Sequence, residues 1–433
     1  MTAVAQQTSP VSTQAPLTLT LQDVLKRARA NSVPVQAAFT DQALAHQDKV
    51  QAQSALLPSV TYNNAYIFSQ GTGSTQVTGA NQPTNVAAPR FIASNAVHEY
   101  LSQGVVQQVV GYGLVSDYRK SKALEAVARA KAEIAARGLV VTVVQSYYGL
   151  IAAQRKYANA QQAATEAERF LSLSRKLENG GEVAHADVLK AQIQFQDRQR
   201  DLREAQLAMD KARLELAVLI FPDFNQNFAV VDDTQLAPPL QSFDEVVRLA
   251  QTRNPELRAF SASLQAAQYE VSASRAGYLP DLTLNYFYGI DAPNFAVNNP
   301  DGFRNLGYSA SATLNIPIWN WGATKSKVTQ ADLRRKRAQR ELSLAQRKLQ
   351  ADMRELYAEA EAARAELDLL KSSAELAAES LRLTTLRYQG GEATVLEVVD
   401  AQNTLTQARN AYNDSELRYR LALANLQTLT GTM

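Results

Sequence analysis

The chain has 433 residues, with 44 Lys and Arg against 42 Asp and Glu, and it contains no cysteine. The balanced charge argues against a surface field that binds nucleic acid, and the lack of cysteine excludes disulfides and thiol catalysis. The three histidines, His46, His98 and His185, are scattered and lack the spacing of metal ligands, so we expect no metal and no cofactor.

Residues 1–18 carry no charged side chain and are rich in Thr, Ser, Gln and Ala, so we expect them to be disordered. The triplet Ala3-Val4-Ala5 has the small-x-small form that ends a secretory signal peptide. This segment therefore fits the remnant of such a leader.

A first repeat is predicted over residues 19–219. Its entry helix, at about 19–56, ends before Leu57-Pro58, and strands follow at about 59–69 and 103–115. A very long helix comes next and contains the uncharged stretch 138–154. That stretch falls short of the ~20 predominantly apolar residues of a membrane span, so we interpret it as a buried helical segment. The helix breaks at a Gly-Gly turn, predicted over 179–185, and then resumes.

After a linker at 220–241, residues 242–431 repeat the same order. Leu57-Pro58 corresponds to Leu279-Pro280 (280 − 58 = 222), and Gly180-Gly181 corresponds to Gly390-Gly391 (390 − 180 = 210). The strands are predicted at about 281–291 and 305–318, and the second turn at 389–394. Because each copy is far longer than a solenoid repeat, this is a duplicated domain.

The long helix of the second copy has a heptad pattern. Leu342, Leu349 and Leu356 recur every seven residues, and so do Met353, Ala360 and Leu367. This period predicts a left-handed coiled coil. A helix from about 323 to 388 would be roughly 100 Å long at 1.5 Å per residue.

The predicted strands alternate apolar and polar side chains and are long enough to cross a bilayer when tilted. Trp319 and Trp321 lie at the end of the last strand, where an aromatic interface belt is expected. No sheet edge stays unpaired in lipid, and single-chain barrels begin at about eight strands. Four strands per chain therefore predict a barrel shared between identical chains. A small soluble sheet is the alternative.

The duplicated helix–strand–strand–helix order and the stretch "RYQGGEATVLEVVDAQ" (387–402) resemble the TolC outer membrane efflux protein family over about 19–431. The resemblance implies an α+β membrane protein, a homotrimer with one 12-stranded transmembrane β-barrel continued by a coiled-coil α-barrel. It also implies an outer-membrane location with most helices in the periplasm. The partners would be outer-membrane lipid, a periplasmic adaptor and an inner-membrane transporter.

The resemblance also assigns roles to residues. Glu397 and Asp400 would form acidic rings at the periplasmic gate; an ordinary acidic pair in a solvated first helical turn is the alternative. Asp187 and Tyr388 would form a latch, and Ala393 stands where some relatives have a basic latch residue, a role that Arg387 could replace. The turns would dock the adaptor through Gly180, Gly181, Glu182, Val183, Gly390, Gly391, Glu392, Ala393 and Thr394.

The expected function is a passive exit duct of a tripartite efflux or type I secretion system. No nucleotide loop or nucleophile constellation is recognisable, so the chain is not expected to be an enzyme. The main alternative is a coiled-coil envelope scaffold without a channel. The sequence leaves the cargo open.

Overall fold

The computed structural model describes residues 17–68, 75–79, 82–86, 98–223, 226–233, 239–298, 300 and 302–431. The disorder expected over residues 1–18 falls outside this part, except that Leu17 and Thr18 belong to a strand. The described chain divides into two compact units. One contains residues 41–128 and 259–343, which we call the sheet unit, and the other contains the rest, which we call the hairpin unit.

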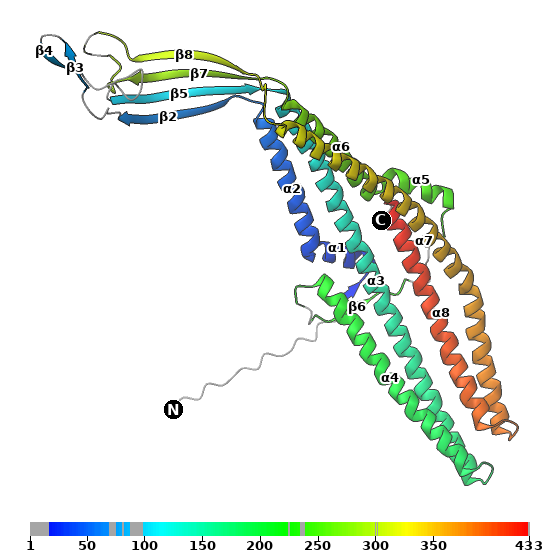
Figure 1. Cartoon of the computed structure of the whole chain (residues 1–433). Helices are drawn as coiled ribbons and strands as arrows, with labels where there is room; N and C mark the ends of the chain where they lie inside the picture. The colour runs from blue at the N-terminus through cyan, green and yellow to red at the C-terminus, as the bar shows by residue number, and fades with distance from the viewer. Residues whose placement is uncertain are drawn as a thin grey trace, which may run out of the picture. The chain divides into compact units, whose positions relative to one another are not determined.

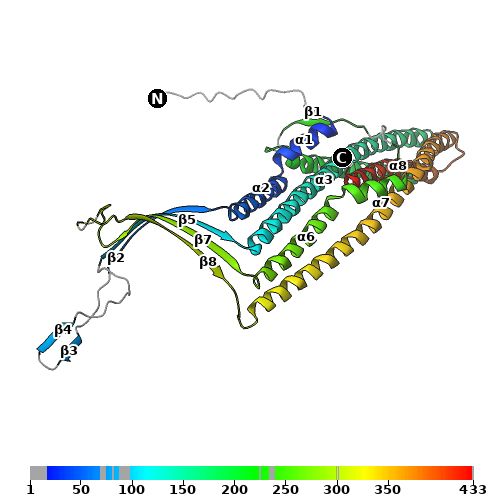
Figure 2. The ribbon, with the colours of Figure 1, turned by 90° about the horizontal axis from the view of Figure 1, so that it is seen from above.

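The sheet unit contains a four-stranded antiparallel sheet in the order β2-β5-β7-β8, with β2 and β8 at its edges (Figure 2). The bounds are β2 Ser59–Phe68, β5 His98–Val110, β7 Asp281–Ala292 and β8 Leu306–Asn315. A separate hairpin joins β3 (Thr75–Gly79) to β4 (Gln82–Val86). Each repeat thus contributes two neighbouring strands to one sheet.

Two predicted strand bounds differ from the structure. The strand expected at 103–115 is β5, which starts at His98 and ends at Val110, because a helix begins at Tyr112. The strand expected to reach 318 ends at Asn315, opposite Asp281, the first residue of its partner. Pro317 lacks the N–H that a longer ladder would require.

The register places the apolar side chains of the second repeat on one face. Leu282 pairs with Leu314, and Tyr288 pairs with Tyr308. The opposite face carries polar pairs such as Thr283 with Thr313. Because side chains alternate along a strand, this sheet has one apolar and one polar face. The predicted alternation is therefore present.

The first repeat is less regular, because polar side chains interrupt the same apolar face. Asn64 pairs with Ser102, and Ser102 pairs with Ile290, which lies on the apolar face. These polar groups satisfy one another: the Ser102 hydroxyl donates to Asn64 Oδ1 at 2.7 Å and lies 2.8 Å from the Tyr62 hydroxyl. Such mutual bonding lowers the cost of polar groups on an apolar surface.

Both entry helices, expected to be continuous, are broken in two. The first consists of α1 (Leu21–Asn31) and α2 (Val33–Ser54), and the second of α5 (Phe243–Arg253) and α6 (Pro255–Ala276). The residues at the breaks, Ser32 and Asn254, have extended backbone. Pro34 and Pro255 stand in the first turn that follows, where the missing N–H costs little.

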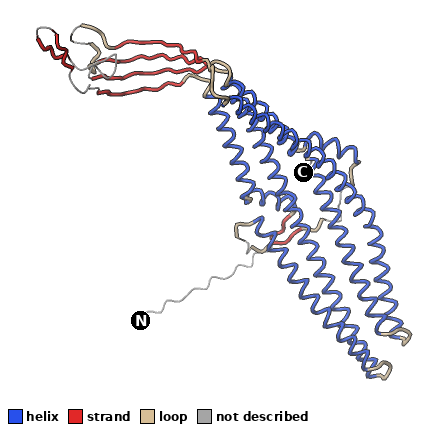
Figure 3. Tube along the Cα trace, viewed as in Figure 1, coloured by secondary structure: helices blue, strands red, loops and turns tan. Residues whose placement is uncertain are grey.

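The hairpin unit contains most of four long helices: α3 (Tyr112–Asn179), α4 (His185–Ile220), α7 (Ala323–Gln389) and α8 (Val395–Thr430). α3 and α4 form one hairpin and α7 and α8 form another, each with a short turn at its tip (Figures 1 and 3). Within the predicted linker, β6 (Phe228–Val230) pairs in parallel with β1 (Leu17–Leu19). This pair joins the two ends of the first repeat.

The uncharged stretch 138–154 lies within α3, which is the one described helix long and apolar enough to cross a membrane by length and composition. Val143, Val144, Tyr147 and Ile151 from this stretch are buried in a core together with Ile220. The packing agrees with the interpretation of a buried segment in a longer helix.

The heptad positions of α7 face inward in the hairpin unit. Leu349, Met353, Ala360 and Ala363 are buried, as the pattern predicts. A second set of apolar residues on α4 and α7 remains outside these cores: Leu189, Ile193, Leu207, Leu214, Val218, Leu344, Leu369, Leu376 and Leu383.

Candidate functional site

The two hairpin tips end in the same backbone motif. Gly181 and Gly391 have φ values of 77° and 76°, a left-handed conformation that glycine adopts without steric cost. In the first tip the Glu182 N–H donates to the Leu177 carbonyl at 2.9 Å, and in the second the Glu392 N–H donates to the Arg387 carbonyl at 2.8 Å. These six-to-one bonds identify Schellman caps, so each Gly-Gly pair ends one helix and reverses the chain.

One apolar core lies beneath both tips. It combines Phe170 of α3 and Val188 of α4 with Tyr388 of α7 and Val398 of α8. Of the residues expected to dock an adaptor, Val183 and Ala393 pack against this core and are half-buried. The others are exposed: Gly180, Gly181, Glu182, Gly390, Gly391, Glu392 and Thr394.

The second tip has a complete helix cap. The Glu397 N–H donates to the Thr394 hydroxyl at 3.4 Å, and the Thr394 N–H donates to Glu397 Oε1 at 3.1 Å. Arg387 lies 3.6 Å from Glu397 across the turn. The hydrogen bonds from the Thr394 N–H and hydroxyl, and then the charge of Arg387, hold the pKa of the Glu397 carboxyl below its usual value. Glu397 is therefore ionised near neutral pH.

Asp400 lies one helical turn after Glu397 and is also exposed. No hydrogen bond or ion pair joins it to the described part of the chain. Side chains three positions apart on a helix share a face. The structure therefore places two exposed carboxylates on one face of α8, an arrangement that both the gate and an ordinary solvated acidic pair predict.

The first tip differs at both equivalent positions, which lie 210 residues earlier. Asp187 corresponds to Glu397, and Lys190 replaces the second acid. Ala184 lies directly before α4, and its methyl group cannot accept a hydrogen bond to cap the helix. Asp187 instead lies 3.7 Å from Lys190, and the His185 ring lies 2.6 Å from Glu178 across the turn. An acidic pair is present at the second tip and not at the first.

The expected latch between Tyr388 and Asp187 is not formed within the chain. The buried Tyr388 hydroxyl donates to Ser174 Oγ of α3 at 3.2 Å, and its ring packs on Phe170 at 5.1 Å. The contact of Ser174 with Tyr388 could not be predicted from the sequence, because a serine in a long helix has no distinguishing pattern of neighbours. Arg387, considered as a replacement latch, donates to the carbonyl of Glu392 at 3.1 Å.

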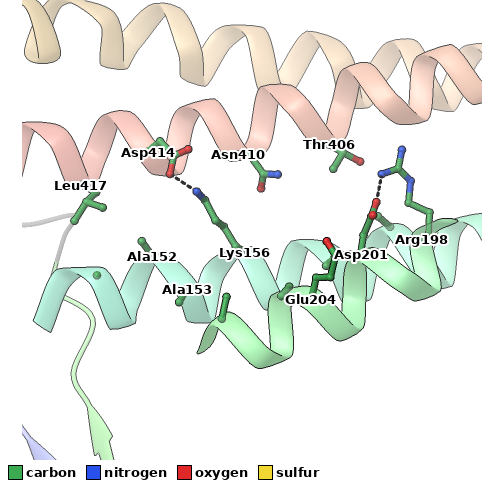
Figure 4. A pocket seen from close by; sticks show the side chains of 15 residues that line it. Ala152, Ala153, Lys156, Arg198, Asp201, Glu204, Thr406, Asn410, Asp414 and Leu417 are labelled. Carbon is green, nitrogen blue, oxygen red and sulfur yellow. Dashed lines mark hydrogen bonds and ion pairs between the residues drawn. The ribbon is translucent and has the colours of Figure 1, made fainter. Parts of the chain in front are cut away.

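A groove of about 630 Å³ runs along α3, α4 and α8 (Figure 4). Small residues such as Ala152 and Ala153 form part of its wall. An ion pair joins Lys156 of α3 to Asp414 of α8 at 2.7 Å, and a second lies within α4, between Arg198 and Asp201 at 2.9 Å. Its lining includes no histidine, cysteine or serine. In the described chain no three His, Cys, Asp or Glu side chains are placed to hold a metal.

A cluster of charged residues that the sequence did not reveal joins both hairpins to the linker. Arg155 of α3 pairs with Glu416 of α8 and, at 2.7 Å, with Asp232 of the linker. The Tyr412 hydroxyl donates to Glu416 at 3.0 Å. Tyr147 of α3 donates to the Val231 carbonyl at 2.5 Å. These contacts fix the linker between the two repeats.

Trp319 and Trp321 lie between β8 and α7 in the sheet unit, four and six residues beyond the end of β8 at Asn315. Their rings meet edge to face at 5.9 Å and are 75% and 89% exposed. Trp321 has a φ of 55°, which is uncommon for a residue with a side chain. Both rings are largely exposed, and the interface belt stays a prediction.

The sequence of the chain is similar to those of known outer-membrane proteins. The family model described as "Outer membrane efflux protein" matches residues 246–432. The outer membrane protein TolC of Vibrio cholerae is 24% identical over 95% of this chain and 91% of its own length. The alkaline protease secretion protein AprF of Pseudomonas aeruginosa is 24% identical over 96% and 85%.

Solved structures share the fold. The outer membrane protein VceC from Vibrio cholerae superimposes with a TM-score of 0.80 at 16% identity, covering 95% of this chain and 96% of its own. The CmeC outer membrane channel of Campylobacter jejuni gives 0.78 at 18% identity, covering 95% and 85%. The fold is thus that of outer-membrane channels. The chain is similar to outer membrane efflux proteins of the TolC type, by sequence over most of its length and by the family model over its second half. It is an outer-membrane protein with a periplasmic helical part.

Proposed function

We propose that three copies of this chain form a passive exit duct across the outer membrane, gated at the helical tips. The duct would serve a tripartite efflux or type I secretion system, in which a periplasmic adaptor links it to an inner-membrane transporter. The relatives named for protease secretion and for TolC support this class of function.

The observation that carries the proposal is the open sheet. Its edge strands β2 and β8 run in opposite directions, because each of the three pairings between them is antiparallel. β8 of one copy can therefore pair with β2 of the next in the same antiparallel sense. An unpaired edge in lipid costs several kcal/mol for each unsatisfied group, so the ring must close. The family resemblance selects three copies and twelve strands.

The uncovered leucines of the hairpin unit support the same assembly. Leu369, Leu376 and Leu383 are spaced by seven residues on α7 and are exposed, in addition to the buried heptad positions. Leu207 and Leu214 have the same spacing on α4. A helix with two apolar stripes packs against a neighbour on each side. In the proposed trimer, α4 and α7 of adjacent copies would cover these stripes.

The gate would be formed by the second tips. Three copies of Glu397 and Asp400 around a narrow axis would repel one another and attract cations, since exposed charges interact over about 8–10 Å at physiological ionic strength. Opening would require the tips to separate. Because both tips share one apolar core around Tyr388 and Val398, the two hairpins of a chain would move together.

No chemistry is required of such a duct, and we propose that the chain is not an enzyme. The adaptor would contact the exposed residues of the tip turns, Glu182 and Glu392 among them. Val183 and Ala393 would contribute less, because they are half-buried against the core.

The decisive test is to image the purified protein in detergent and to measure its conductance in planar bilayers. We expect a long hollow cylinder with threefold symmetry and cation-selective current. A protein that stays monodisperse and monomeric without detergent would instead establish the scaffold alternative, because a sheet with lipid-facing side chains aggregates in water.

A further inference from the structure

The helices that leave the sheet carry an unusual concentration of positive charge. Arg119, Lys120 and Lys122 lie in the first eleven residues of α3, and Lys325 and Lys327 lie in the first five of α7. Arg275, in the last turn of α6, lies just before β7 begins. All six belong to the sheet unit, and they lie in the parts of α3, α6 and α7 that adjoin the strands in sequence. We call them the basic collar.

The collar is not neutralised by the protein. No acidic side chain of the described chain forms an ion pair with any of the six. The nearest acids in sequence are Asp117, which is exposed, and Asp281, which has one buried carboxylate oxygen. Farther along the helices the acids Glu125, Glu270 and Asp332 are paired with Lys49, Arg334 and Arg335. The first turns therefore keep a net positive charge.

The two lysines at the start of α7 also oppose helix stability. The N-terminus of a helix is the positive end of its dipole and favours acids, and five described helices (α1, α4, α5, α6 and α8) have an acid in their first turn. The first turns of α2, α3 and α7 have none. In α7, Lys325 and Lys327 instead place cations at the start of the helix. The helix dipole does not favour these two lysines, so helix stability does not account for their position.

The depth of the collar indicates a partner for it. Lys325 and Lys327 follow Trp321 by four and six residues, and α7 begins between Trp321 and Lys325, at Ala323, so these lysines lie within about 6 Å of the start of the helix along its axis. Tryptophan rings mark the apolar boundary of a bilayer, and the headgroup layer beyond it is about 5–7 Å thick. Side chains on a helix tilt toward its N-terminus, which for α3 and α7 is the sheet, and lysine extends its charge into the headgroups. With the sheet inserted as proposed, Lys325 and Lys327 would thus lie at the level of the lipid phosphates.

We propose that the basic collar binds the headgroups of anionic phospholipids in the leaflet next to the helices, and so fixes the depth of the barrel. This inference depends on the proposed membrane insertion of the sheet. Arginine and lysine near a membrane surface attract anionic headgroups, and the attraction weakens with salt. Zwitterionic lipids would bind less tightly, because their headgroups carry no net charge.

The chain provides its own probe, since its two tryptophans are Trp319 and Trp321, beside the collar. The purified protein is reconstituted into phosphatidylcholine vesicles that contain increasing fractions of phosphatidylglycerol with brominated chains, which quench tryptophan fluorescence on contact. The reference series uses brominated phosphatidylcholine. We expect phosphatidylglycerol to bind at least about fivefold more tightly than phosphatidylcholine at low salt.

The test variant carries Arg119→Gln, Lys122→Gln, Lys325→Gln and Lys327→Gln, for which we expect the two lipids to bind equally. The control removes four exposed charges elsewhere on α7, through Arg347→Gln, Lys348→Gln, Arg354→Gln and Arg364→Gln, and should keep the preference. Equal binding of the two lipids by the wild type, or an undiminished preference for phosphatidylglycerol in the test variant, would contradict the proposed lipid binding by the basic collar. Absence of quenching by either brominated lipid would instead show that the sheet is not in the bilayer, and the proposed function would fail with it.

Discussion

Asp187 and Glu397 occupy the same position, the third residue of the helix that follows each Gly-Gly turn, yet only Glu397 caps its helix. The difference comes from the residue directly before each helix, which is Ala184 in the first tip and Thr394 in the second. The two tips of one chain therefore share a backbone and differ in how firmly the returning helix begins.

Removing the cap should loosen the second tip alone. Thr394→Ala deletes the hydroxyl that accepts from the Glu397 N–H, at a cost of about 1 kcal/mol. We expect the first-turn amides of α8 to exchange about fivefold faster, as measured by hydrogen–deuterium exchange. The matched change, Ala184→Thr, should slow exchange at the start of α4. Equal responses at both tips would contradict the assignment.

The second tip should also loosen in acid. The ionised Glu397 accepts the hydrogen bonds that lower its pKa in the folded state, so its contribution to stability is complete above the usual glutamate pKa of 4.5. That contribution is lost as pH falls below about 4.5 and through the lowered pKa. Exchange protection at the start of α8 should decrease over this range, relative to the intrinsic rates. Glu397→Gln should remove most of the pH dependence.

A double-mutant cycle can decide the partner of Tyr388. Tyr388→Phe and Ser174→Ala should each cost about 1 kcal/mol of unfolding free energy, and the double variant should cost little more, because both delete one hydrogen bond. Denaturant unfolding measures these costs. With Asp187→Asn in place of Ser174→Ala, the effects should add. Coupling between Tyr388 and Asp187 would restore the latch that the family resemblance implies.

The acidic pair of the second tip should control ion flow. We expect Glu397→Ala combined with Asp400→Ala to raise conductance in planar bilayers or to weaken block by multivalent cations, because the negative charge at the constriction is lost. Asp187→Ala with Lys190→Ala, the equivalent change in the first tip, should have a smaller effect. Unchanged current and unchanged block in the first variant would remove these residues from the gate.

Removing one partner of the ion pair between Arg155 and Glu416 should lower the free energy of unfolding more than removing both partners. Arg155→Met leaves the carboxylate of Glu416 without its cation in a largely buried position, which we expect to cost about 3 kcal/mol in denaturant unfolding. Adding Glu416→Met should recover the part of that loss that comes from the unpaired Glu416 carboxylate, since two apolar side chains can pack where the pair was, while Asp232, whose side chain is 41% exposed, stays solvated. A double variant as unstable as the single one would show that the pair itself stabilises the fold.

The features that could be predicted from the sequence are those with a local pattern. The Gly-Gly turns, the alternating strands and the heptads of α7 each depend on neighbouring residues, and the structure contains all three. The breaks in the entry helices had a local signal in Pro34 and Pro255, but a proline in a first turn is compatible with a continuous or an interrupted helix.

Contacts between distant segments could not be predicted in this way. Ser174 meets Tyr388 across 214 residues, and Arg155 meets Glu416 across 261. Which polar side chains pair in a core depends on how two hairpins pack, and one sequence contains no direct record of that packing. The pairing of β1 with β6 is a third example, since three-residue strands have too little pattern to recognise.

The opposite directions of β2 and β8 have a consequence for biogenesis. In the proposed shared barrel, a single chain would leave both edges of its sheet without hydrogen-bond partners in lipid, so it would insert only after it meets other copies. The rate at which mature pores accumulate should therefore rise more steeply than linearly with the amount of newly exported chain. When little of the chain is made, unassembled chains would stay in the periplasm longer and would be more exposed to proteolysis.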